Sequence, residues 1–290
     1  MTATNYLTFV DGVALISDGA KYTVNDHDIT ITGFGSKIRT PDETVPFGFM
    51  TTGNSFLGDV FSDWVIKVSD GFLDFDKAAR IFPEVLKELY ETNRLVGALG
   101  GRHERLSVAF GGWSASRQAF TSDFVSNYAE LKRRAFEPTG YQNDIWPAPT
   151  IQGVIRLMTN VEIEGNVAAY GISQFAAKIL QAQRRQILGF NPRLKKPPVC
   201  IVGGFGELVR ITRSGTRREV VIRWSDQVGD GQEALRRRVA SEPGLALMVA
   251  KSRAERRRER RNAREAACRL AEPITKPGGY RQSSRLGGDP

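Results

Sequence analysis

The sequence predicts an α+β fold in which helices cover antiparallel sheets. Short alternating or β-branched apolar runs fill the first fifty residues, apolar residues at helical spacing dominate 55–95, and strand-like and helical runs alternate again up to residue 224. Runs of strands that alternate with runs of helices favour α+β over the βαβ order of a parallel sheet. With 290 residues, of which 41% are hydrophobic, the chain can bury a large core.

The first fifty residues predict an antiparallel meander of short strands. The runs 6–10 and 13–17 flank Asp11-Gly12, a two-residue hairpin signal because the glycine can adopt a positive φ. Further strands are expected at 28–32, 36–39 and 47–52, and the last of these ends at Gly53.

The apolar pattern then changes to a helical period. Seven apolar residues between 56 and 68 recur at helical spacing behind Asn54 or Ser55, either of which can cap a helix, so a helix is expected over 55–69. A second helix is expected over 83–95, with Pro83 in its first turn. Strands are expected at 106–110 and 118–124, joined through 111–114.

The second half of the chain predicts one long helix and a last set of strands. A mixed stretch at 126–149 precedes the longest helical candidate, 169–188. Strands follow at 199–202, 207–212 and 219–224, and a turn at 213–216 joins the last two.

The positive charge is concentrated near the C-terminus. The formal net charge is +9, yet residues 251–290 hold 12 basic and 5 acidic residues, which leaves 29 basic and 27 acidic residues in 1–250. We therefore predict a nearly neutral domain over 1–225 and a basic extension over 226–290 that is partly helical and partly disordered. The high charge describes the extension more than the domain.

Several classes of function are excluded by what the sequence lacks. No stretch of about 18 apolar residues could span a membrane and no secretory signal is recognisable, so a cytoplasmic location without membrane attachment is expected. Two cysteines do not make a disulfide framework. With two histidines and no phosphate loop or HExxH motif, neither a metal nor a cofactor is expected.

The extreme N-terminus carries the sharpest functional signal. Thr2 follows Met1 and precedes Asp18 by sixteen positions, and Asp18 ends the second arm of the predicted hairpin. This segment resembles the start of proteasome β-type subunits and their bacterial relatives, which are N-terminal-nucleophile (Ntn) hydrolases. In that family a Thr at the mature N-terminus precedes an acidic residue by this spacing.

The resemblance continues to about residue 224. Segment 35–38 resembles the segment with the family's active-site lysine, here Lys37, and 49–53 resembles the strand whose final glycine, here Gly53, supplies an oxyanion-hole N–H. Segment 107–113 is similar to the family's next strand, and 203–213 to the late strand that brings a second acidic residue, here Glu207.

The resemblance has consequences for architecture and assembly. It implies a four-layer αββα sandwich, in which two antiparallel sheets lie between helical layers. It also implies a peptide or amide substrate and a closed homo-oligomer.

The implied chemistry needs neither a histidine nor a metal. A Thr hydroxyl is a weak nucleophile until a base takes its proton, and a free α-amine is partly unprotonated at a pH of about 7. Thr2 can therefore supply both nucleophile and base once Met1 is removed. The Lys37 ammonium would favour the developing alkoxide, Asp18 would hold Lys37, and the Gly53 N–H would donate to the tetrahedral oxyanion.

A second function remains open. Glu207 stands where the family usually has Asp, and Arg210 where it usually has Ser. The alternative is a catalytically inactive Ntn-like scaffold whose basic segment, 251–264, binds nucleic acid or an acidic protein. Eight Arg or Lys residues in that segment could neutralise several phosphates, although a solvated Arg/Glu helix has the same composition.

Overall fold

The computed structural model describes residues 3–24, 29–69, 72–96, 105–129, 134–140, 143–146, 150–151, 154–155, 160–189 and 202–242. Contacts divide the chain into one compact unit over 1–243 and a second over 244–290. The second unit lies outside the described residues, so the predicted basic segment 251–264 and the disordered end stay predictions. Thr2, both histidines and both cysteines also lie outside them.

The first sheet has five antiparallel strands in the order β10-β1-β2-β13-β14. Its strands are β1 (Thr4–Phe9), β2 (Gly12–Asp18), β10 (Asn143–Trp146), β13 (Phe205–Thr212) and β14 (Gly215–Arg223). The predicted N-terminal hairpin is confirmed, but its turn is Val10-Asp11 rather than Asp11-Gly12, because Phe9 pairs with Gly12, which belongs to β2 and does not adopt a positive φ. The hairpin β13–β14 is also confirmed, with longer arms than expected.

The second sheet is also antiparallel and has the order β5-β6-β7-β8-β9. Its strands are β5 (Ile38–Arg39), β6 (Phe47–Gly53), β7 (Leu106–Ser114), β8 (Ala119–Ser126) and β9 (Thr139–Gly140). Two small pairs complete the described strands: β3 (Ala20–Val24) with β4 (Ile29–Phe34), and β11 (Thr150–Ile151) with β12 (Val154–Ile155).

Strand β7 corrects the sequence prediction, which placed 111–114 in a connection. The strand runs through Gly111 and Gly112 and ends at Ser114. A Cβ on Gly112 would lie 2.3 Å from the Pro46 carbonyl oxygen, and one on Gly111 would lie 2.7 Å from Val13 Cγ1. The glycines therefore allow close approach within the sheet and towards the first sheet, which is a tertiary requirement that the local sequence does not show.

The predicted first helix is confirmed as α1 (Ser55–Val68), and Asn54 Oδ1 caps it by accepting the Leu57 N–H at 3.1 Å. The second helix, α2 (Phe75–Val96), begins eight residues before the predicted start and carries Pro83 in its interior. Phe75, Ala78 and Phe82 are fully buried, so core packing extends the helix across the proline.

The long helix predicted over 169–188 is largely confirmed, but it begins at Ile172, and its last residues form a 3₁₀ turn. Helix α3 (Asn160–Tyr170) ends before Gly171, whose φ is +76°, and α4 (Ile172–Arg184) continues into a 3₁₀ turn over Arg185–Gly189. A residue at positive φ cannot continue a right-handed helix, and glycine adopts that conformation at little cost. No helix in the described part of the chain is long and apolar enough to cross a membrane.

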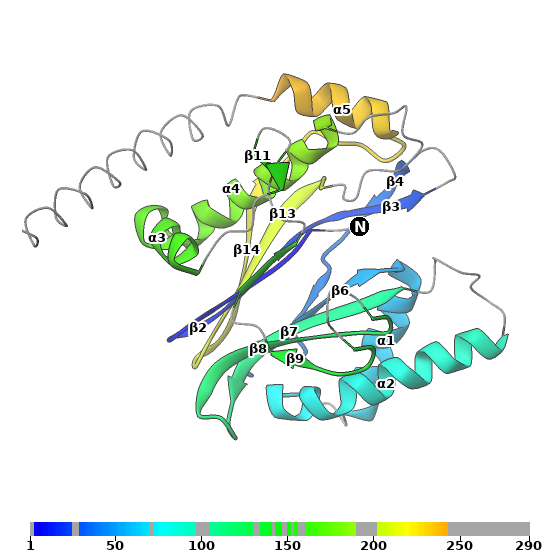
Figure 1. Cartoon of the computed structure of the whole chain (residues 1–290), viewed down its shortest axis with the longest axis vertical. Coiled ribbons are helices and arrows are strands. Elements are labelled where there is room, and N and C mark those ends of the chain that lie inside the picture. Colours follow the sequence, from blue (N-terminus) through cyan, green and yellow to red (C-terminus); the bar gives the residue numbers. More distant parts are fainter. Residues whose placement is uncertain are drawn as a thin grey trace, which may run out of the picture. The chain divides into compact units, whose positions relative to one another are not determined.

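Apolar residues gather in three larger clusters around the two sheets. One cluster joins α1 and α2 to the second sheet, through residues such as Phe61, Phe82 and Phe110. Another joins α3 and α4 to the first sheet, and Phe175 and Leu208 belong to it. The third contains residues of both sheets. Figure 1 shows α1 and α2 on one side of β6–β9, and α3 and α4 beside β13 and β14.

Helix α5 (Gln232–Ser241) lies beyond the predicted domain boundary at 225. Its Leu235 and Val239 pack with Ile29 and Ile31 of β4 and with Ile187. Ile31 N donates to Asp230 O at 3.0 Å, which joins the segment before α5 to β4. The boundary at 225 stays a prediction, and the described chain beyond it, up to residue 242, is packed on the β3–β4 hairpin.

Candidate functional site

Asp18 stands where four segments of the chain meet. It is the last residue of β2, and its side chain is 0% exposed. Among the described residues, Oδ1 accepts hydrogen bonds from Ala3 N and Lys37 Nζ, each at 3.1 Å, and Oδ2 accepts from Ala20 N and Gly203 N, each at 3.2 Å. A buried carboxylate is costly unless it is paired and hydrogen-bonded, and Asp18 is both.

The chain entering β1 is held at both backbone groups of one residue, Ala3. Ala3 N donates to Asp18, and Ala3 O accepts from Ser17 Oγ at 2.9 Å. Ser17 and Asp18 are both buried and adjacent at the end of β2. The direction from which the chain approaches Ala3 is therefore fixed beside the Asp18–Lys37 pair. Sequence reasoning missed Ser17, although a polar residue at the end of an apolar strand and next to Asp18 was an available signal.

Lys37 is held from both sides. Its side chain is 10% exposed and forms the ion pair with Asp18. Before it, Ser36 Oγ donates to Glu207 Oε2 at 2.5 Å and accepts from Arg218 Nη1 at 2.7 Å. After it, Ile38 O accepts from Arg218 Nη2 at 3.1 Å.

Glu207 is buried on β13 and acts on the segment around Lys37. Its Oε1 accepts a short hydrogen bond from Arg218 Nη1, and its Oε2 accepts from Ser36. On the backbone Glu207 pairs with Ser17, one residue before Asp18. These contacts make Glu207 a neighbour that orients the segment around Lys37. Neither Ser36 nor Arg218 was found by sequence reasoning, because Ser36 and Glu207 are 171 residues apart.

Gly53 ends β6 with a φ of +118°, and a Cβ there would lie 2.1 Å from Arg105 O. Only glycine fits this position. Ile38 pairs with Met50 across β5 and β6, so Lys37 and Gly53 lie toward the same end of the second sheet. Arg210 lies farther away, since it pairs with Ala14, four residues before Asp18 on β2.

The structure thus brings Asp18 and Lys37 into direct contact. Glu207 contacts Ser36, the residue before Lys37. Gly53 lies toward the same end of the second sheet as Lys37. The candidate nucleophile Thr2 lies outside the described residues. In the part of the chain that the structure describes, no group of three or more His, Cys, Asp or Glu residues could hold a metal ion.

Known proteins that are similar to this chain are found among solved structures. No protein-family profile and no curated protein matches the chain. A solved structure of the Anbu (Gly-1) mutant from Hyphomicrobium sp. strain MC1 is similar, with 15% sequence identity and a TM-score of 0.49. The match covers 88% of this chain and 100% of that chain.

The electrostatics of the site follow from its burial. The Asp18–Lys37 pair is shielded from water, so its attraction is screened less than that of an exposed pair. The nearby pairs of Asp59 with Lys21 and Arg39 have side chains that are 37% to 51% exposed. Exposed pairs of this kind contribute little to stability. The Asp18–Lys37 pair therefore differs in exposure from these surface pairs.

Proposed function

We propose that the protein is a threonine-type Ntn hydrolase that cleaves a peptide or another amide bond, with Thr2 as the nucleophile after removal of Met1. The observation that carries the proposal is the shared oxygen of Asp18, which binds both Ala3 N and Lys37 Nζ. Residue 2 is bonded to Ala3 N, and successive Cα atoms lie about 3.8 Å apart. In the proposed site, residue 2 would therefore stand close to the buried Lys37 ammonium.

The proposed reaction has two halves. The free α-amine of Thr2 takes the proton of its own hydroxyl, Oγ attacks the amide carbonyl carbon, and the C–N bond breaks as the proton passes to the leaving amine. Water then attacks the ester carbonyl carbon, the C–Oγ bond breaks as a proton from that water passes to Oγ, and the carboxylic acid product leaves. Lys37 would stabilise the alkoxide, Asp18 would hold Lys37, and the Gly53 N–H would donate to the tetrahedral oxyanion. Glu207 would fix the segment that carries Lys37.

The proposal includes a four-layer αββα sandwich with a basic C-terminal extension. The three large apolar clusters support the layers, because one lies between the sheets and one lies between each sheet and its helices. A closed homo-oligomer and a cytoplasmic location belong to the same proposal and rest on the family resemblance and on sequence composition.

Intact-mass spectrometry with a β-lactone electrophile tests the proposal. We expect a protein without Met1 that gains one acyl group on residue 2. Lys37→Met should slow labelling strongly, whereas Lys21→Met is the matched control, because Lys21 is a half-exposed lysine paired with Asp59. Retained Met1, or labelling that persists in Thr2→Ala, would contradict the mechanism.

The alternative function is a catalytically inactive scaffold whose segment 251–264 binds nucleic acid or an acidic protein. It is favoured by the eight basic residues in fourteen positions. Binding through phosphates weakens steeply with salt. RNA and DNA are titrated at two salt concentrations, with the full chain and with a chain that ends at residue 250. Affinity that is salt-sensitive and lost in the shortened chain supports this function. Equal affinity of the two chains contradicts it.

A further inference from the structure

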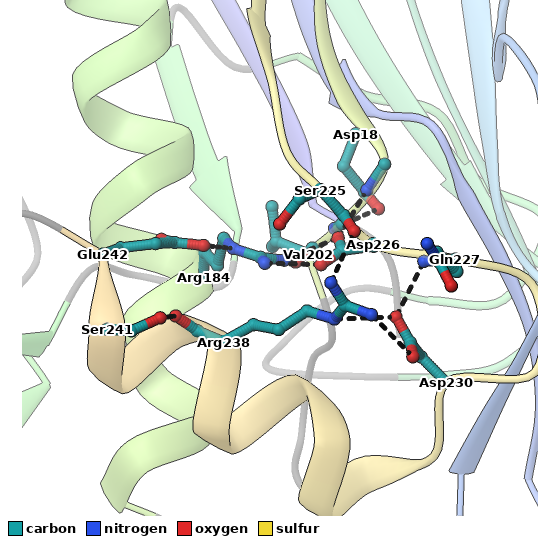
Figure 2. Close-up of polar contacts among 12 residues, drawn as sticks. Asp18, Arg184, Val202, Ser225, Asp226, Gln227, Asp230, Arg238, Ser241 and Glu242 are labelled. Carbon is teal, nitrogen blue, oxygen red and sulfur yellow. Dashed lines mark hydrogen bonds and ion pairs between the residues drawn. The ribbon is translucent and has the colours of Figure 1, made fainter.

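The turn at Gly203 and Gly204 connects Asp18 to a second buried carboxylate. Gly203 N donates to Asp18 Oδ2 at 3.2 Å, and the next N–H, of Gly204, donates to Asp226 Oδ2 at 2.8 Å. Asp226 follows β14, whereas Asp18 ends β2. Figure 2 shows Asp18 and Asp226 near each other and near Val202. The position of the turn therefore determines how closely the Gly203 N–H approaches Asp18 Oδ2.

Both glycines are required by their surroundings. A Cβ on Gly203 would lie 2.7 Å from Asp226 Oδ2 and 3.5 Å from Arg184 Nη1. Gly204 has a φ of +73°, and a Cβ there would lie 2.3 Å from the Phe34 ring. Side chains thus enclose the turn closely, and glycine leaves the space that lets the carboxylates reach the N–H groups.

Arg184 holds the same turn from the end of α4. Its Nη1 donates to Val202 O at 2.7 Å and to Asp226 Oδ2 at 2.9 Å, and its Nη2 donates to Asp226 Oδ1 at 2.6 Å. Its Nε donates to Glu242 Oε1 at 2.7 Å, just beyond α5, and its guanidinium lies 4.9 Å from the Trp224 ring centroid. The fork of Arg184 thus joins the turn, Asp226 and the end of α5 (Figure 2).

The burial of this pair calls for an explanation other than stability. The side chains of Arg184 and Asp226 are 1% and 0% exposed. Apolar residues of similar volume often replace a buried ion pair without loss of stability, whereas a bidentate pair fixes geometry. Here the pair fixes the Val202 carbonyl and the Gly204 N–H. These groups lie on either side of the Gly203 N–H, which donates to Asp18.

We infer that Arg184 and Asp226 are positioning residues for the Asp18–Lys37 pair, acting through the Gly203 N–H, and that Glu242 links this network to the end of α5. The effect on catalysis rests on the proposed function. The effect on Lys37 does not, because the reactivity of Lys37 can be measured in the protein whether or not Thr2 is a nucleophile.

The test compares the double variant Arg184→Met/Asp226→Leu with Arg238→Met/Asp230→Leu in the full chain. The second variant removes another Arg–Asp pair, between Arg238 on α5 and Asp230 before it, in which Arg238 contacts Ser225 O rather than the turn. The first readout is acetylation of Lys37 relative to Lys21 by an N-hydroxysuccinimide ester, measured by peptide mass spectrometry. The second is the pH profile of Thr2 labelling by the β-lactone.

We expect the first double variant to remain folded, to acetylate Lys37 several-fold faster and to shift the pH profile, while the control changes neither readout. A folded variant with unchanged Lys37 acetylation overturns the inference. If the double variant does not fold, Arg184→Lys decides: it keeps the charge but loses the fork, so an intermediate rise in acetylation supports the inference and no rise overturns it. If Thr2 is unreactive in the wild-type chain, the proposed function fails. The positioning role of Arg184 and Asp226 is then tested by the acetylation rate of Lys37 alone.

Discussion

Two arginine–carboxylate pairs flank the Asp18–Lys37 pair, and they differ mainly in exposure. Arg218 and Glu207, which hold Ser36 and Ile38 around Lys37, have side chains that are 38% and 5% exposed. Arg184 and Asp226, which hold the turn beside Asp18, are 1% and 0% exposed. Water can replace a lost partner at the first pair but not at the second. The same chemistry should therefore have different energetic consequences on the two sides of the site.

The largest expected effect is at the buried pair. Asp226→Leu leaves the Arg184 guanidinium with Glu242 as its remaining carboxylate, so we expect a loss of about 3–5 kcal/mol in the free energy of unfolding. Arg184→Met/Asp226→Leu should recover most of that loss, because no charge remains buried alone. Urea denaturation measures both. If the single variant is as stable as the double one, the buried pair behaves like an exposed one and the comparison fails.

A smaller effect is expected from Gly203→Ala. The new methyl group would meet Asp226 Oδ2 at 2.7 Å, so the turn or the carboxylate has to move, at a cost of about 2 kcal/mol. Gly33→Ala is the control, since a Cβ at Gly33 has nothing within 4 Å. Thermal unfolding of the two variants gives the difference. Equal melting temperatures would show that the turn is looser than its contacts indicate.

The half-exposed pair should be less sensitive. Arg218→Met removes the donor to Glu207 and to Ile38 O, while Ser36 still donates to Glu207. Because water can reach this side, we expect a loss of about 1–2 kcal/mol, and Arg217→Met, an exposed neighbour on β14, should cost less. Denaturation in urea compares them. A loss as large as that of Asp226→Leu would remove the distinction between the two pairs.

In the described part of the chain, the buried Asp123 has no comparable network of hydrogen bonds, and its Oδ1 has no partner. Burial raises the pKa of the Asp123 carboxyl, and the Arg117 guanidinium, 3.7 Å away, opposes that rise. A carboxyl with a raised folded-state pKa destabilises the fold when ionised, and the penalty disappears as pH falls through that pKa. Asp123→Asn should therefore stabilise the protein by about 1 kcal/mol near neutral pH.

The stabilisation by Asp123→Asn should shrink as the pH is lowered, because the wild-type carboxyl then becomes protonated. Unfolding free energies measured from neutral to mildly acidic pH give the trend. Asp42→Asn is a suitable reference, because hydrogen bonds from the Thr44 backbone and side chain lower the pKa of the exposed Asp42. A constant gain at all pH values would show that burial does not raise the pKa of Asp123.

Local patterns predicted the parts of the fold that depend on neighbours in sequence. The hairpin β1–β2 and helix α1 follow from a turn signal and from a cap with an apolar stripe. The start of α2 depends on the burial of Phe75 and Phe82, and the passage of β7 through Gly111 depends on Val13 in the other sheet. These requirements are tertiary, so the sequence around each residue does not display them.

The candidate site divides in the same way. Asp18, Lys37, Gly53 and Glu207 could be proposed because their segments resemble, in order and spacing, those of the Ntn family, and Asp18 and Lys37 form a direct ion pair. The residues that hold them could not be proposed. Ser36 meets Glu207 across 171 positions, and an arginine at the end of α4 gives no local sign that it will bind a turn near residue 203.

The bond from Gly203 to Asp18 also sets an order of assembly during synthesis, because its two ends are 185 positions apart. Strands β1 and β2 leave the ribosome early, whereas β13, the neighbour of β2, is translated long after them. Contacts of such high sequence separation form late and only after most of the chain is available. A nascent chain therefore carries Asp18 and Lys37 without the turn that completes their environment. Any chemistry at this site would begin only when nearly the whole described chain has folded.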